Sequence, residues 1–147
     1  MVAYYSIQQE GHDNHETDKF ITKYADNEQF VDEYNELFTL LDDWGENGIP
    51  YAHRRKFRHE NEAKSLPPYG MGGGYLRLYC YPMVDNILIL GNGGHKVNIT
   101  DTHQASPFLK PHFDFFRAVA RKLDQAWKDR EIYVKDNLLE GDLELWL

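Results

Sequence analysis

Three groups of residues in this chain could act on a phosphate. His95 and Lys96 pair a side chain that exchanges protons near neutral pH with a permanent cation, after a glycine-rich stretch and at the end of an expected strand. Arg77 stands between aromatic residues, as on surfaces where bases stack and an arginine holds a phosphate. The third group is the basic tract at residues 52–59. The residues expected to contact RNA are Arg54, Arg55, Lys56, Arg58, His59, Tyr75, Tyr79 and Tyr81.

Each group also has a purely structural interpretation. His95 and Lys96 would then occupy an exposed turn, the tyrosines a sheet face covered by a helix, and the basic tract a solvated edge. His12 and His15 have a spacing that is common by chance in polar segments, so no metal site and no cofactor is expected. Cys80 alternates onto the buried face and is expected in the core.

Composition and charge limit the classes of function. A chain of 147 residues suits one domain, and a single Cys rules out a disulfide framework or a four-Cys zinc site. A cytoplasmic protein without membrane contact is expected, because no apolar run approaches the ~20 residues of a membrane span and the N-terminus lacks a signal-peptide layout. The net charge of −8 argues against nucleic acid. Residues 51–100, however, hold seven basic and three acidic side chains, so the middle third is basic.

Hydrophobic periodicity indicates the elements that would position these residues. We expect a strand within residues 2–8, a short helix within 15–24, and a long helix capped by Asp26 and ended by residues 45–50. Residues 75–81 and 87–90 should pair as a hairpin. The glycines within residues 91–94 should end the second strand, which residues 95–97 would briefly resume. A last helix should follow Ser106-Pro107 and end near Arg130. These elements predict an α+β domain.

Two finer expectations follow from the same patterns. Because Leu76 and Leu78 should be buried, Arg77 is expected to face outward from a central strand. The segment 132–147 mixes acidic and apolar residues and is expected to dock on the domain rather than hang free in water. It would pack near the basic tract and mask it, form the contact of a homodimer, or add to the core.

Four short motifs, in this order, resemble the RelE/ParE toxin superfamily, most closely its HigB-like branch. They are residues 46–50, 56–58, 75–79, and 87–90 followed by 92–96, and the likeness runs from about residue 27 to 128. The resemblance implies a small twisted antiparallel sheet packed with N-terminal helices and a C-terminal helix. It also implies the toxin component of a type II toxin-antitoxin system, which acts on mRNA on the ribosome and is neutralised by an antitoxin protein.

The resemblance further implies roles for single residues. In that family an Arg on the strand that corresponds to Leu76-Arg77-Leu78 steadies the scissile phosphate, and a residue past the next strand assists charge stabilisation or proton transfer, which falls on His95 or Lys96. The paired Lys of many relatives, on the strand before the Arg strand, has no cation to match it at residues 67–71.

The implied reaction is metal-independent cleavage of mRNA. A 2′-hydroxyl attacks its own phosphate, a base accepts the proton, and fixed cations stabilise the transition state. The alternative is a non-catalytic protein of the same fold that binds another protein, as the gyrase-directed branch does, or an accessory protein of mobile elements. Arg77 with His95 and Lys96 favours cleavage, whereas the absent Lys pair and the acidic charge favour binding.

Overall fold

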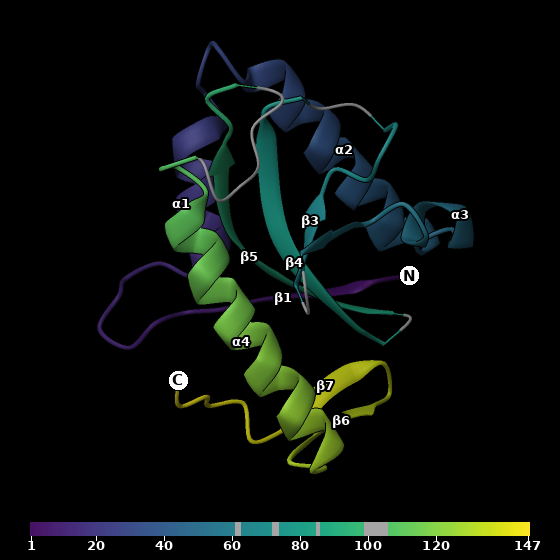
Figure 1. Ribbon diagram of the computed structural model, residues 1–147. Helices are drawn as coiled ribbons and strands as arrows, with labels where there is room; N and C mark the ends of the chain where they lie inside the picture. Colours follow the sequence, from purple (N-terminus) through teal and green to yellow (C-terminus); the bar gives the residue numbers. More distant parts are fainter. Residues whose placement is uncertain (61–62, 72–73, 85, 99–105) are drawn as a thin grey trace.

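A computed structural model describes residues 1–60, 63–71, 74–84, 86–98 and 106–147, apart from the side chains of residues 59 and 60. Five strands form a mixed sheet in the order β1-β5-β4-β3-β2, in which β1 runs parallel to β5 and the other neighbours are antiparallel (Figure 1). None of the described helices combines the length and the apolar character of a membrane span. The elements are β1 (Ala3–Ser6), α1 (Glu16–Tyr24), α2 (Val31–Asn47), α3 (Tyr51–Arg54), β2 (Arg58–Glu60), β3 (Ala63–Leu66), β4 (Leu76–Val84), β5 (Ile87–His95), α4 (Lys110–Lys128), β6 (Ile132–Lys135) and β7 (Leu138–Gly141).

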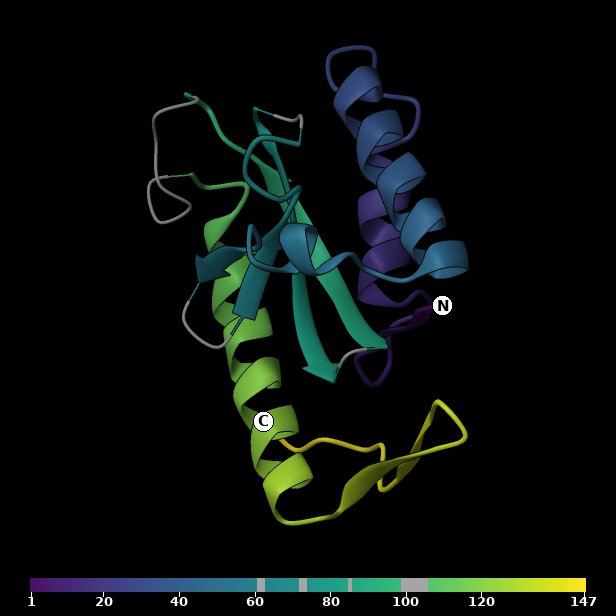
Figure 2. The same cartoon turned by 90° about the vertical axis from the view of Figure 1, so that its right-hand side faces the viewer.

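Helices cover both faces of the sheet. Figure 2 shows α1 and α2 on one side and α4 on the other. Leu76, Leu78 and Cys80 pack in the core beneath α1 and α2, whereas Tyr79 packs in the core beneath α4. This confirms the predicted alternation along β4 and the α+β class, and it places both faces of the strand in a hydrophobic core.

Several boundaries differ from the prediction. Asp26 does not cap α2, which begins at Val31 after Phe30. The sheet is mixed rather than antiparallel, because β1 pairs parallel with β5. Residues 91–94 do not close β5, which continues to His95. The strand before β4 is β3 rather than residues 67–71, and it carries a cation at Lys64. Its short, polar sequence hid a strand that is stabilised by pairing with β4.

The glycines in β5 allow α4 and the segment before it to approach the sheet closely. A methyl group at Gly91 would overlap the ring of Phe116 in α4, and one at Gly94 would overlap the main-chain oxygen of Phe108. Both positions therefore require the absence of a side chain rather than an unusual backbone angle. The close approach brings the segment before α4 onto the end of β5.

The C-terminal segment folds back as a hairpin of β6 and β7. Asp136 and Asn137 have φ angles of 52° and 61°, which suit a tight two-residue turn. Leu139 is buried with α4, and its N–H donates to the hydroxyl of Tyr5 in β1 at 2.9 Å. The prediction that this segment lies near the basic tract is wrong, because β1 and the basic strand β2 are opposite edges of the sheet.

Gly94→Ala is expected to destabilise the fold by about 1–3 kcal/mol, because its methyl group would meet backbone rather than a movable side chain. Gly45→Ala is the matched control. It lies inside α2 with only an ordinary contact to Tyr4, so the gain in helix propensity should stabilise by about 0.5–1 kcal/mol. Denaturant unfolding of both variants measures the difference, and equal effects would contradict the close approach.

Candidate functional site

The side chain of His95 is enclosed by rings from three different segments. Its ring stacks on that of Phe108 with the centroids 4.3 Å apart, and it lies 4.6 Å from the ring of Phe30. The hydroxyl oxygen of Tyr24 is 2.8 Å from His95 Nδ1 and forms a hydrogen bond with it. The end of α1, the N-cap of α2 and the segment before α4 therefore meet at the end of β5.

Burial and a nearby cation keep this imidazole neutral. Burial lowers the pKa of His95 below its ordinary value, and the positive charge of Lys23 lowers it further. The Lys23 ammonium lies 5.2 Å from the ring centroid of Phe108 and 5.3 Å from that of Tyr24. Burial also raises the pKa of Tyr24, so its hydroxyl remains protonated.

Tyr75 and Lys96 lie next to His95, where their backbones pair and the Tyr75 ring lies beside Phe30. Lys96 N–H donates to the Tyr75 carbonyl at 3.0 Å, and the Tyr75 ring lies 6.4 Å from that of Phe30. One carboxylate oxygen of Glu33 in α2 accepts the N–H groups of three successive residues, Gly74, Tyr75 and Leu76. We call the set Lys23, Tyr24, Tyr75, His95, Lys96 and Phe108 the His95 cluster. Of the predicted residues, it unites Tyr75, His95 and Lys96.

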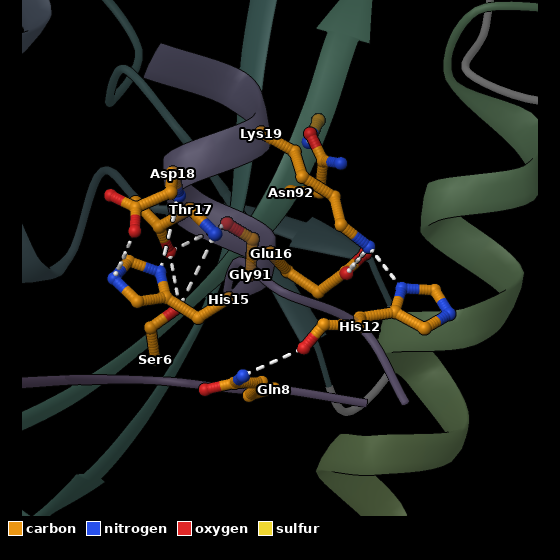
Figure 3. A network of polar contacts seen from close by, with 11 residues as sticks. Ser6, Gln8, His12, His15, Glu16, Thr17, Asp18, Lys19, Gly91 and Asn92 are labelled. Atoms are coloured by element: carbon orange, nitrogen blue, oxygen red, sulfur yellow. Dashed lines mark hydrogen bonds and ion pairs between the residues drawn. The ribbon is translucent and has the colours of Figure 1, made fainter. Parts of the chain in front are cut away.

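A polar network fixes the other end of α1 to the sheet (Figure 3). The Thr17 hydroxyl donates to the Gly91 carbonyl at 2.9 Å and lies 2.6 Å from the hydroxyl of Ser6. Glu16, of which only 5% is exposed, forms an ion pair with Lys19. With its first turn tied to β1 and β5, α1 runs beside β5 and carries Lys23 and Tyr24 to His95.

The two early histidines serve this network separately. His15 caps α1 by accepting the Asp18 N–H at 3.1 Å, whereas His12 Nδ1 lies 2.7 Å from Lys19 Nζ (Figure 3). Their i, i+3 spacing therefore places His15 at the N-cap of α1 and His12 beside Lys19. Within the described parts of the chain, no group of three or more His, Cys, Asp or Glu side chains could hold a metal ion.

Arg77 does not face solvent, so the prediction of an outward side chain is wrong. It is 5% exposed, and its Nη1 donates to the Leu76 carbonyl at 2.7 Å. In the β4–β5 pairing Arg77 is opposite Gly94, and Leu76 is opposite His95. Directly opposed residues share a face, so Arg77 and His95 point to opposite sides of the sheet. Alternation predicted the correct face of β4 for Arg77, but the segment before α4 covers that face.

The tyrosines after Arg77 also lie on the covered face. Tyr79 has no exposed surface and its ring is 5.7 Å from that of Phe113 in α4. Tyr81 is half-buried and donates its hydroxyl to Asp124 Oδ1 at 3.2 Å. At Tyr79 and Tyr81 the sheet face is therefore covered by a helix, α4, which is the structural alternative to a base-stacking surface. Tyr75, at 38% exposure, remains accessible.

The basic tract lies at the β2 edge, apart from the His95 cluster. Trp44 Nε1 donates to His53 Nδ1 at 3.2 Å, and Arg58 Nε donates to the Pro67 carbonyl at 2.8 Å. Arg54 and Arg58 are half-buried, whereas Arg55 and Lys56 are exposed. The tract also presents two exposed rings, because the guanidinium of Arg58 lies 4.2 Å from the ring centroid of Tyr69 and that of Arg55 lies 5.8 Å from the ring centroid of Tyr51. The His59 side chain is outside the described residues.

Comparison with models of protein families, with curated proteins and with solved structures finds no match for this chain. What the His95 cluster can do is inferred from its own chemistry. A neutral imidazole, an ammonium group and an accessible aromatic ring together suit an anion attached to a flat group, which is the chemical character of a nucleotide.

We expect His95 to titrate below the ordinary value of 6.5 in an NMR titration. Lys23→Met should raise its pKa but leave it below 6.5, because burial, the larger cause, remains. Lys122→Met, at an exposed position of α4, should leave it unchanged. Since the unfolded chain binds the proton more readily, this histidine's contribution to stability is present above pH 6.5 and is lost as the pH falls. A pKa at or above 6.5 would contradict the enclosure.

Proposed function

We propose that this chain is the toxin component of a type II toxin-antitoxin system, an mRNA interferase that acts on mRNA on the ribosome without a metal. The observation that carries the proposal is the His95 cluster, where Lys23 lies over Phe108, the ring on which the neutral imidazole stacks, and where Tyr75 and His95 both lie beside Phe30. Two N-terminal helices over a small sheet also fit the RelE/ParE resemblance. The same proposal implies a cognate antitoxin protein as partner.

The cluster suits the charge that develops during cleavage of RNA. The 2′ oxygen forms a bond to phosphorus while its proton passes to solvent, and the bond from phosphorus to the 5′ oxygen breaks as that oxygen takes up a proton. The five-coordinate phosphorus carries extra negative charge. Lys23 and His95 would contact its oxygens, with Lys96 as a further cation, and Tyr75 would stack on a neighbouring base. Arg77, enclosed on the other face, is not part of this proposal.

The basic tract suits a separate contact with the RNA backbone. Arg55 and Lys56 are exposed, and Tyr51 and Tyr69 beside them have 74% and 56% of their surface exposed. Alternating cations and rings bind single strands by charge and by stacking, without reading the sequence. This contact would supply affinity, while the His95 cluster would supply the chemistry.

A second candidate is the non-catalytic, protein-binding function. The burial of Arg77 favours it, because the structure does not bring this Arg together with His95. A protein of this kind would arrest growth by binding a partner, and its cellular mRNA would stay intact.

Induced expression should arrest growth and create new mRNA 5′ ends. His95→Ala and Lys23→Ala should each reduce cleavage by about 10²–10³-fold, the usual effect of removing one donor to a developing oxyanion. Lys122→Ala is the matched control and should cleave as the parent does. Arrest without new 5′ ends would instead support the protein-binding candidate, and the absence of arrest would contradict both.

Arg55→Gln with Lys56→Gln should weaken binding to single-stranded RNA. Each lost phosphate contact should reduce the slope of log affinity against log salt by about 0.7. Lys122→Gln with Lys135→Gln removes the same charge at exposed positions elsewhere and should leave the slope unchanged. Fluorescence anisotropy at several salt concentrations measures both pairs, and equal slopes would exclude the basic tract from RNA binding.

A further inference from the structure

We infer that Tyr24 fixes the tautomer of His95, so that Nε2 carries the hydrogen and donates it to a phosphoryl oxygen held between His95 and Lys23. Tyr24 is thereby a positioning residue, and His95 is a hydrogen-bond donor rather than a base. The assignment of the tautomer stands on the structure alone, whereas the identity of the ligand as RNA phosphate rests on the proposed function.

The hydroxyl of Tyr24 determines the direction of the hydrogen bond. Tyr24 has no exposed surface, so water does not reach its O–H group. Within the part of the chain that the structure describes, His95 Nδ1 at 2.8 Å is its hydrogen-bond partner. A buried hydroxyl that donates to nothing is costly, so the O–H donates and Nδ1 accepts.

The state of the imidazole agrees with this direction. A neutral imidazole carries one N–H, so a ring whose Nδ1 accepts must carry its hydrogen on Nε2. The opposite arrangement, with Nδ1–H donating to Tyr24, would leave the Tyr24 hydrogen without an acceptor in the described structure. A base would need a lone pair on Nε2, and this tautomer does not have one.

The surrounding rings orient the donor. Phe108 stacks at 4.3 Å and Phe30 lies at 4.6 Å, so the imidazole is held between them. Nε2 is separated from Nδ1 by Cε1, and its N–H bond diverges widely from the direction of the Nδ1 lone pair, so it points away from Tyr24. The Lys23 ammonium sits over Phe108, the ring on which His95 stacks. An N–H donor and a cation on the same rings suit an oxyanion and exclude a cationic ligand.

The tautomer can be read directly in the full-length protein. Two-bond ¹H–¹⁵N correlation spectra at pH 7.5 should show His95 Nε2 as the protonated nitrogen and Nδ1 as the hydrogen-bonded acceptor. Tyr24→Phe should shift the two nitrogens toward a mixture of tautomers. Tyr34→Phe, at a partly buried tyrosine that packs against the same core, should leave the signals unchanged. A protonated Nδ1 in the parent would overturn the inference.

Substitutions at His95 separate the donor from a base. The amide nitrogen of His95→Gln reaches about the position of Nε2, so this variant should keep RNA cleavage within about 10-fold of the parent, whereas His95→Ala should lose about 10²–10³-fold. Equal losses in both variants would overturn the donor role. Titration with inorganic phosphate should shift the His95 signals saturably and more weakly in Lys23→Met, and no shift in the parent would overturn the anion site.

The failure of the proposed function would look different. A parent protein that shows the Nε2–H tautomer and binds phosphate, yet produces no new mRNA 5′ ends, would retain the anion site and exclude the interferase.

Discussion

The close packing of α4 and the segment before it on the glycine-rich half of β5 is the constraint on which the rest of the structure depends. On one side Thr17 of α1 bonds to the Gly91 carbonyl. On the other side Phe116 and the backbone of Phe108 occupy the space that side chains at Gly91 and Gly94 would fill. Bulkier residues would hold the layers apart. His95, the next residue, is consequently reached by Tyr24 from one layer and by Phe108 from the other.

The same packing has opposite consequences for His95 and Arg77. The segment before α4 stacks Phe108 on His95 and lies across Gly94, the residue opposite Arg77. Building the His95 cluster therefore encloses Arg77. One small anion cannot contact both side chains in this arrangement, because they point to opposite faces of the sheet. On the His95 side of this strand end, the cation that α1 supplies is Lys23.

Local patterns predicted the longer helices and the β4–β5 hairpin but not what covers them. Alternation along β4 gave the faces of Leu76 and Tyr79 correctly, because a period of two is a property of the strand itself. It could not show that a helix covers the second face, since α4 begins about thirty residues later. Lys23 gave no signal, because its proximity to His95 depends on α1 docking along β5. The sequence could not distinguish β2 from a loop edge, because the pairing with β3 that forms this edge strand leaves no pattern in so short a segment.

Net charge is a poor guide to this site because a site responds mainly to the charges close to it. Glu16 lies at the opposite end of α1 from Lys23 and forms an ion pair with Lys19. Glu33 in α2 accepts three backbone N–H groups. Lys23 makes no ion pair with the described residues, and it lies in the last turn of α1, where the helix dipole favours a cation. Charges farther than about 8–10 Å away are largely screened at physiological salt. Lys23 thus acts as a positive charge on His95 although the chain as a whole is acidic.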